Sequence, residues 1–127
     1  LMEFKQKNPT VQMSELICET VENFLTYLMR MNRSRDHRLV IQGIPCPNIN
    51  VENHSEIEIL ELTKTIALFN KELKSRSTGQ GMGFLDVHEI TNNGEGFSNK
   101  LWHLDDHHLT SKAMQLAWEK HASCIPF

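Results

Sequence analysis

The sequence has few cysteines, and none of them is in a paired arrangement. Cys18, Cys46 and Cys124 are odd in number, widely spaced and form no Cys-x-x-Cys motif. A disulfide framework is therefore not expected, because such frameworks use an even set of cysteines. Free thiols are typical of a reducing compartment, so we expect a cytoplasmic protein.

Long apolar runs and dense basic runs are also missing. No apolar stretch approaches the length of about 20 residues that a membrane-spanning helix needs, and the N-terminus has no signal-peptide layout. The net charge is −3, and the most basic stretch, residues 30–36, is interpreted as a solvated turn. We therefore expect neither a nucleic-acid partner nor a membrane partner.

The composition that remains is that of a globular domain. The chain has 127 residues, of which 39% are hydrophobic and 23% are charged. These fractions are typical of folded proteins, and a chain of this size can bury a core. We expect one domain over residues 1–127. The first residue is Leu1 rather than Met, which is expected of a fragment or of a processed product.

Apolar periodicity predicts an alternation of helices and strands. The expected helices span residues 9–33, 53–76 and 110–121, and the expected strands span residues 38–44 and 84–87. The first strand has no polar alternation, which favours burial on both faces in a parallel sheet. The first helix carries an apolar stripe that we expect to pack on this sheet. The fold class is therefore α/β.

Two strands make an incomplete sheet. Strands as apolar as these need neighbours at their edges and helices on both faces. We therefore expect the missing neighbours to come from another chain, giving a homodimer, or from a missing N-terminal part that associates with this one.

Acid and base groups are concentrated in one segment just before the last helix. Two carboxylates and three imidazoles lie within residues 103–108, namely His103, Asp105, Asp106, His107 and His108. No other part of the chain has this density of titratable groups. The segment follows a loop rich in glycine and asparagine at the end of the second strand, where ligands gather in open α/β sheets.

This segment resembles the last conserved block of the SGNH (GDSL-like) serine hydrolases. The resemblance is carried by Asp105-x-x-His108-Leu109 entering a helix, after a strand, a glycine- and asparagine-rich loop and Trp102. The strand that ends in Gln42-Gly43-Ile44-Pro45-Cys46-Pro47 is similar to the strand and proline turn before that block. The resemblance covers roughly residues 11–121.

The resemblance implies a fold, an activity and a site. The fold would be the C-terminal portion of a three-layer α/β/α, flavodoxin-like parallel-sheet domain. The activity would be ester hydrolysis on a small-molecule acyl ester or acetylated carbohydrate, without a cofactor or metal. Asp105 would match the acid of the catalytic triad and His108 the general base. An aspartate three residues before a histidine can accept its Nδ1–H and stabilise the imidazolium.

The chain also departs from this family. The Gly-Asp-Ser nucleophile block and the blocks that complete the oxyanion hole are absent. Ser98 is the serine nearest to the site in sequence, but Gly96-Phe97-Ser98-Asn99-Lys100 lacks the second glycine of a nucleophile elbow and precedes no expected helix. We therefore expect the nucleophile to lie outside this chain, and the chain alone to be inactive.

Two other functions remain open. The cluster His103, Asp105, Asp106, His107 and His108 could form a His/Asp metal-binding site for zinc or another divalent ion. Alternatively, the chain is a non-catalytic interaction module in which Asp106 caps the last helix. Trp102 could line an acyl or sugar pocket, but we expect it to pack in the core. Asp86 could reach the site, but we expect it to make an ordinary hydrogen bond to a neighbouring turn.

Overall fold

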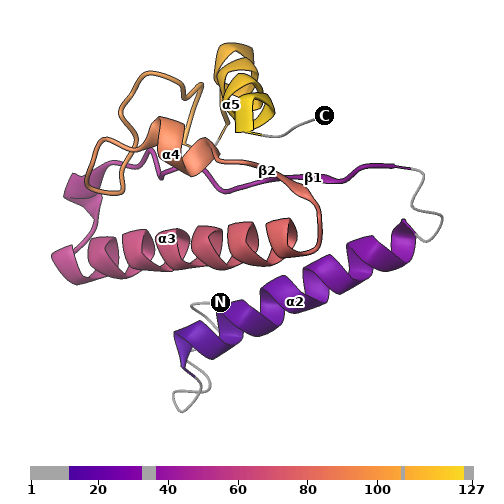
Figure 1. The fold of residues 1–127 in the computed structure, drawn as a ribbon. Helices are drawn as coiled ribbons and strands as arrows, with labels where there is room; N and C mark the ends of the chain where they lie inside the picture. The colour runs from indigo at the N-terminus through magenta and orange to yellow at the C-terminus, as the bar shows by residue number, and fades with distance from the viewer. Residues whose placement is uncertain (1–11, 33–36, 107, 125–127) are drawn as a thin grey trace.

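The computed structural model describes residues 12–32, 37–106 and 108–124. Its elements in chain order are α2 (Met13–Met31), β1 (Val40–Gln42), the 3-10 helix η1 (Val51–Asn53), α3 (Glu56–Gly79), β2 (Gly83–Leu85), α4 (Val87–Thr91) and α5 (Ser111–Cys124) (Figure 1). The predicted alternation of helices and strands is confirmed, and the fold class is α/β. The expected start of the first helix, at residue 9, lies outside the described residues. No helix within the described ranges is long and apolar enough to cross a membrane.

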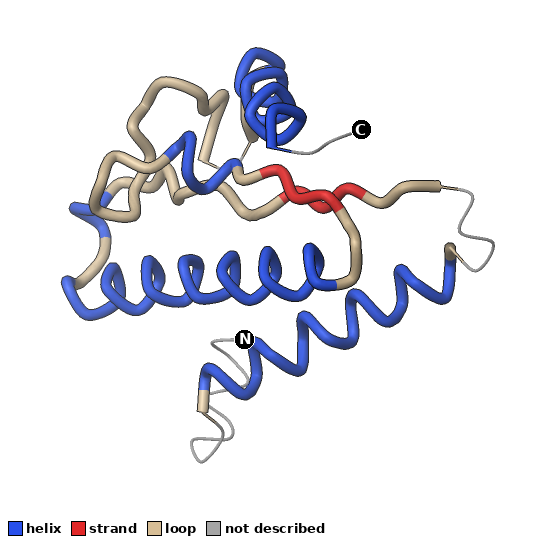
Figure 2. Tube along the Cα trace, in the orientation of Figure 1, coloured by secondary structure: helices blue, strands red, loops and turns tan. Residues whose placement is uncertain are grey.

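The sheet consists of β1 and β2, which are parallel as predicted (Figure 2). Val40 pairs with Gly83, and Gln42 pairs with Leu85. Backbone hydrogen bonds continue the pairing at both ends, where Gly83 N–H donates to Leu39 O and Gly43 N–H donates to Leu85 O. Both strands are shorter than predicted, because the chain leaves the sheet at the proline turn and at Asp86.

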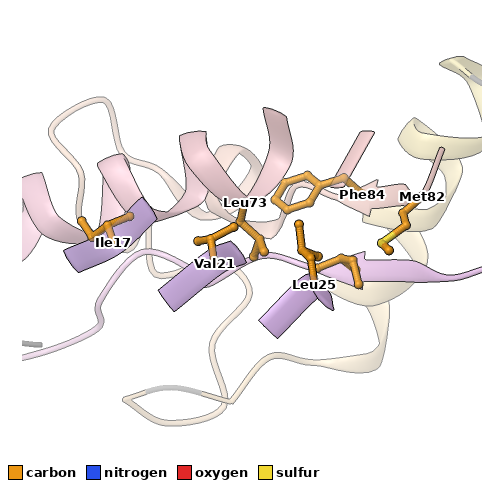
Figure 3. Packing of buried hydrophobic residues seen from close by; sticks show 7 residues of the cluster. Ile17, Val21, Leu25, Leu73, Met82 and Phe84 are labelled. Carbon is orange, nitrogen blue, oxygen red and sulfur yellow. The ribbon is translucent and has the colours of Figure 1, made fainter. Parts of the chain in front are cut away.

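Helices cover both faces of this sheet. Phe84 points to the face covered by α3, where one hydrophobic cluster lies (Figure 3). Gly83 points to the opposite face, where a Cβ atom would lie 2.6 Å from the ring of His121 on α5. A second cluster lies between α4 and α5 and is formed by Val87, Ile90, Ala113 and Ala117. Each fully buried Val or Ile contributes about 1.5–3 kcal/mol.

Helix α2 packs mainly against α3, and the expectation that its apolar stripe covers the sheet is wrong for most of its length. Its buried residues Ile17, Val21 and Leu25 recur every four positions and so form one stripe. Leu25 belongs to the same hydrophobic cluster as the strand residue Phe84 (Figure 3). Among the residues described, the sheet has only two strands, and the long helix α3 already covers the face of the sheet on this side. Helix α2 therefore packs on α3 rather than on the strands.

Side-chain caps fix where two helices begin. Ser55 accepts a hydrogen bond from Glu58 N at 3.2 Å and caps α3. Asp86 Oδ1 accepts from Glu89 N at 3.1 Å and caps α4, while Oδ2 lies 3.1 Å from Lys74 Nζ. Asp86 therefore makes hydrogen bonds that hold a turn, as predicted from the sequence. The second predicted strand is wrong at its end, because Val87 belongs to α4.

Candidate active site

The segment that carries Asp105 and His108 is a narrow hairpin at the edge of the sheet where both strands end. An antiparallel bridge pairs His103 with Leu109. Leu104 N–H donates to His108 O at 2.8 Å, and Thr110 N–H donates to Trp102 O at 2.8 Å. These bonds close the turn around Asp105 and bring it next to His108. His107 lies outside the described residues.

Asp105 contacts His108 with both carboxylate oxygens. Oδ1 accepts the backbone N–H of His108 at 2.7 Å, and Oδ2 lies 2.7 Å from the ring atom Nδ1. The two side chains are 53% and 64% exposed, respectively. The backbone bond fixes the carboxylate and the ring bond fixes the imidazole, so the pair is oriented while it remains accessible. This is the geometry that the spacing of the two residues predicts.

Asn48 ties this hairpin to the turn that follows β1. Its Nδ2 donates to Asp105 O at 3.0 Å, and its backbone N–H donates to Asp106 O at 3.4 Å. The Oδ1 atom of Asn48 accepts from Lys100 Nζ. Asn48 thus holds the backbone of the turn that carries the acid. Sequence reasoning missed this residue, because no local pattern marks a contact between segments so far apart.

Ser98 and His103 form a second hydrogen-bonded pair beside the first. Ser98 Oγ lies 2.8 Å from His103 Nδ1 and accepts Lys100 N–H at 3.0 Å. Ser98 is only 4% exposed, and its backbone N–H donates to Pro47 O at 3.0 Å. Ser98 therefore joins three loop segments: its hydroxyl contacts His103 and Lys100, and its backbone N–H bonds to Pro47. His103, for which the sequence predicted no separate role, holds the hairpin to Ser98.

The environment of His103 lowers the pKa of its imidazole. Burial is the main cause of the lowered pKa, and the positive charge of Lys100 lowers the pKa further. A hydrogen bond with the backbone of Cys46 and, more weakly, the negative charge of Asp105 raise the pKa. Because its Nε2 atom is buried and its neutral form is favoured, His103 is poorly placed to exchange a proton with a substrate, and its contact with Ser98 gives it a structural role.

The last helix is capped by Thr110, and the expectation that Asp106 caps it is wrong. Thr110 Oγ1 accepts Ala113 N–H at 3.3 Å, and the helix begins at Ser111. Asp106 is exposed in the hairpin turn, too early in the chain to reach the first turn of α5. Trp102 is half-buried and packs against the cluster of α4 and α5, in agreement with the core interpretation.

Cys46 is fully buried between the two prolines of the turn. Its N–H donates to Thr91 Oγ1 at 2.9 Å, and its thiol lies 3.4 Å from His88 O. Burial raises the pKa of the Cys46 thiol, partly offset by the hydrogen bond of Thr91 and reinforced by Asp86. Burial also lowers the pKa of His88, against the opposing charge of Asp86. A buried neutral thiol is a poor nucleophile, so Cys46 is a packing residue.

Within the described part of the chain, no group of three or more His, Cys, Asp or Glu side chains is arranged to hold a metal ion. The Nδ1 atoms of His103 and His108 are directed to Ser98 and Asp105 instead. No family model, curated protein or solved structure matches the chain. Function is therefore inferred from the site itself, whose chemical capacity is that of an oriented aspartate–histidine pair.

Proposed function

We propose that the chain is the C-terminal part of a serine ester hydrolase of the SGNH (GDSL-like) type. In this proposal Asp105 and His108 act on a nucleophilic serine that lies outside these residues. The observation that supports it most is the pair of 2.7 Å contacts from Asp105 to the backbone and the ring of His108. An exposed histidine fixed in this way is suited to move a proton between two oxygen atoms.

The proposed mechanism follows from which ring nitrogen is engaged. Asp105 accepts the Nδ1–H of His108, so Nε2 is the atom that takes the proton of the serine hydroxyl as it attacks the ester. The carboxylate stabilises the imidazolium, which then protonates the leaving alcohol. A water molecule hydrolyses the acyl-enzyme through the same histidine. The substrate is a small acyl ester or an acetylated carbohydrate, and the steps need no cofactor.

The fold proposed with this function is the C-terminal portion of a three-layer, flavodoxin-like domain. Helices α3 and α5 on opposite faces of a parallel sheet support it. The backbone of Ile41 bonds to β2, so the N–H and C=O groups of Val40 and Gln42 face the other edge of β1. Within the described residues nothing pairs with that edge. A strand that carries the serine would pair there, from an N-terminal part of the same protein; a strand from a second copy could cover this edge but would not supply the nucleophile.

The test uses a polypeptide that joins these 127 residues to the sequence encoded before Leu1. We expect that sequence to contain Gly-Asp-Ser after an apolar strand, and the polypeptide to hydrolyse p-nitrophenyl acetate. His108→Ala should abolish the activity, because the general base is lost. His54→Ala is the matched control, since His54 forms another exposed pair with Glu58 at 3.3 Å, outside the site. Undiminished hydrolysis by His108→Ala overturns the proposal.

A non-catalytic interaction module is the second candidate, because α2 exposes large apolar side chains. Phe24, Tyr27 and Met31 are exposed and recur at steps of three and four, on one side of the helix. Exposed apolar patches of this kind mark surfaces that bind other proteins. Light scattering at micromolar concentration tests this candidate: a dimer or larger assembly supports it, and a monodisperse monomer counts against self-association.

A further inference from the structure

Lys100 has an unusual backbone conformation. Its φ of 65° is the only positive φ outside glycine in the described residues. A lysine in the left-handed region is less stable than a glycine there, and such residues cluster where a site requires them. The hydrogen bond from Lys100 N–H to Ser98 Oγ stabilises this backbone conformation. The contact of its Nζ with Asn48 Oδ1 directs the side chain toward the hairpin of Asp105.

A cavity of about 600 Å³ lies between the turn after β1 and the loop after α4. Its lining includes the amide side chains of Asn48, Asn50 and Asn93 and the ring of Phe97, with Lys100 as its one cation and Glu95 as its one acid. Asn48 belongs to both features, because it lines the cavity and also holds Asp105 O at 3.0 Å. The cavity therefore adjoins the loop that carries the aspartate–histidine pair.

Lys100 makes no ion pair with a carboxylate within 4.0 Å within the described residues, although the carboxylate of Glu95 lines the same cavity. An ammonium has three N–H donors, and Asn48 Oδ1 accepts one of them. Two donors remain for a ligand. An anion with two oxygen acceptors, such as a carboxylate, matches this arrangement in both charge and geometry.

We propose that Lys100 is a specificity-determining residue that binds a carboxylate on the substrate. The substrate class is an ester whose acyl or alcohol part ends in a carboxylate a few carbons from the ester group. The inference rests on the proposed function, and it narrows the substrates which that function leaves open. The ring of Phe97 and the apolar side chains of Ile49 and Val51 would contact the carbons between the two groups.

The test compares two ligands of nearly equal size, monomethyl succinate and dimethyl succinate, by NMR titration of the chain at low salt. Only the first carries a carboxylate. We expect it to bind about threefold to fivefold more tightly, the size of one exposed charge pair, and the preference to fall as salt is added. The largest shifts should occur at residues that line the cavity.

Two variants of Lys100 test whether its charge causes the preference for the carboxylate. Lys100→Gln should abolish the preference for the carboxylate. Lys100→Gly should abolish it too, while relieving the strained backbone, so a loss of binding there is not a loss of folding. Lys112→Gln, in the exposed face of α5, should retain the preference. Equal binding of both ligands, or a preference that survives both Lys100 variants, overturns the inference.

The two proposals fail in distinguishable ways. His108→Ala should leave the carboxylate preference of the chain intact, because His108 is not its binding group. If the longer polypeptide hydrolyses p-nitrophenyl acetate but shows no preference for esters with a carboxylate, the specificity proposal is wrong and the hydrolase proposal stands. If Lys100 binds monomethyl succinate but no serine-dependent hydrolysis occurs, the hydrolase proposal is wrong.

Discussion

Two histidines on one hairpin, His103 and His108, have nearly identical ring contacts and opposite surroundings. The Nδ1 atom of each lies 2.8 Å and 2.7 Å, respectively, from an oxygen atom of another side chain. The partner of His103 is a buried hydroxyl, whereas the partner of His108 is an exposed carboxylate. A hydroxyl carries no charge to stabilise an imidazolium, and the buried Nε2 atom of His103 cannot reach a substrate. Of the two contacts, only that of His108 has a charged partner and an exposed side chain, which is what the proposed catalysis requires.

The largest expected effect is on catalysis, from Asp105→Asn in the longer polypeptide. We expect kcat to fall by about 10⁴, because an amide does not hold the ring in the required tautomer. The free energy of unfolding should change by less than about 0.5 kcal/mol, since the pair is exposed. Steady-state kinetics and urea unfolding measure the two quantities. If a stably folded Ser98→Ala variant lost kcat to a similar extent, the Ser98–His103 pair would also be required for catalysis, and the contrast with the Asp105–His108 pair would be wrong.

The second expected effect is on stability, from Ser98→Ala. The substitution removes the hydroxyl that contacts His103 Nδ1 and Lys100 N–H. Leaving these groups without a partner should lower the free energy of unfolding by about 1–3 kcal/mol. Ser75→Ala, at an exposed position within α3, is the control and should be nearly neutral. Equal stability of the two variants in urea would show that the Ser98–His103 link carries no structural role.

A smaller effect is expected from pH. Burial lowers the pKa of His103 and of His88 in the folded chain, so the unfolded chain binds more protons as the medium becomes acidic. Their contribution to stability is therefore complete above the ordinary pKa of about 6.5, and it is lost as the pH falls through the lower folded pKa. Urea unfolding between pH 8 and 5 should show a decline that is shallower in His103→Gln. Identical slopes would contradict a lowered pKa of His103 in the folded chain.

The smallest effect is a spectroscopic one. We expect opposite tautomers in the two rings: Nδ1–H for His108, whose carboxylate partner can only accept, and Nε2–H for His103, with the Ser98 hydroxyl as the donor to its Nδ1. Nitrogen-15 NMR of the imidazoles at pH 8 distinguishes them. Asp105→Ala should release the Nδ1–H preference of His108 and leave the tautomer of His103 unchanged. The same tautomer in both rings would contradict the comparison.

Local patterns in the sequence predict the parts of the molecule that depend on neighbouring residues. The helices from Met13, Glu56 and Ser111 follow from apolar periodicity, and the strands follow from runs rich in branched residues. The contact of Asp105 with His108 also follows, because three positions across a turn suffice for it. Helix α4 does not follow, since a helix of five residues is too short to establish a period.

Contacts between distant segments escape this kind of prediction. Asn48 holds Asp105 O across 57 positions of sequence, and nothing in the Pro-Cys-Pro-Asn turn indicates that partner. The Ser98–His103 pair depends on how two loops fold over Pro47. The same limit explains the wrong expectation for α2: periodicity shows that a helix has an apolar face, but not which element covers it.

The labelling rate of the buried Cys46 thiol can report how often the edge of the sheet near the candidate site opens. A thiol with no exposed surface reacts with a thiol reagent only when its surroundings open, so its labelling rate measures the population of open molecules. Cys46 is held by Thr91 and His88, the residues that join the proline turn to α4. In a variant that retains Cys46 alone, labelling would follow transient opening of this turn, separately from global unfolding.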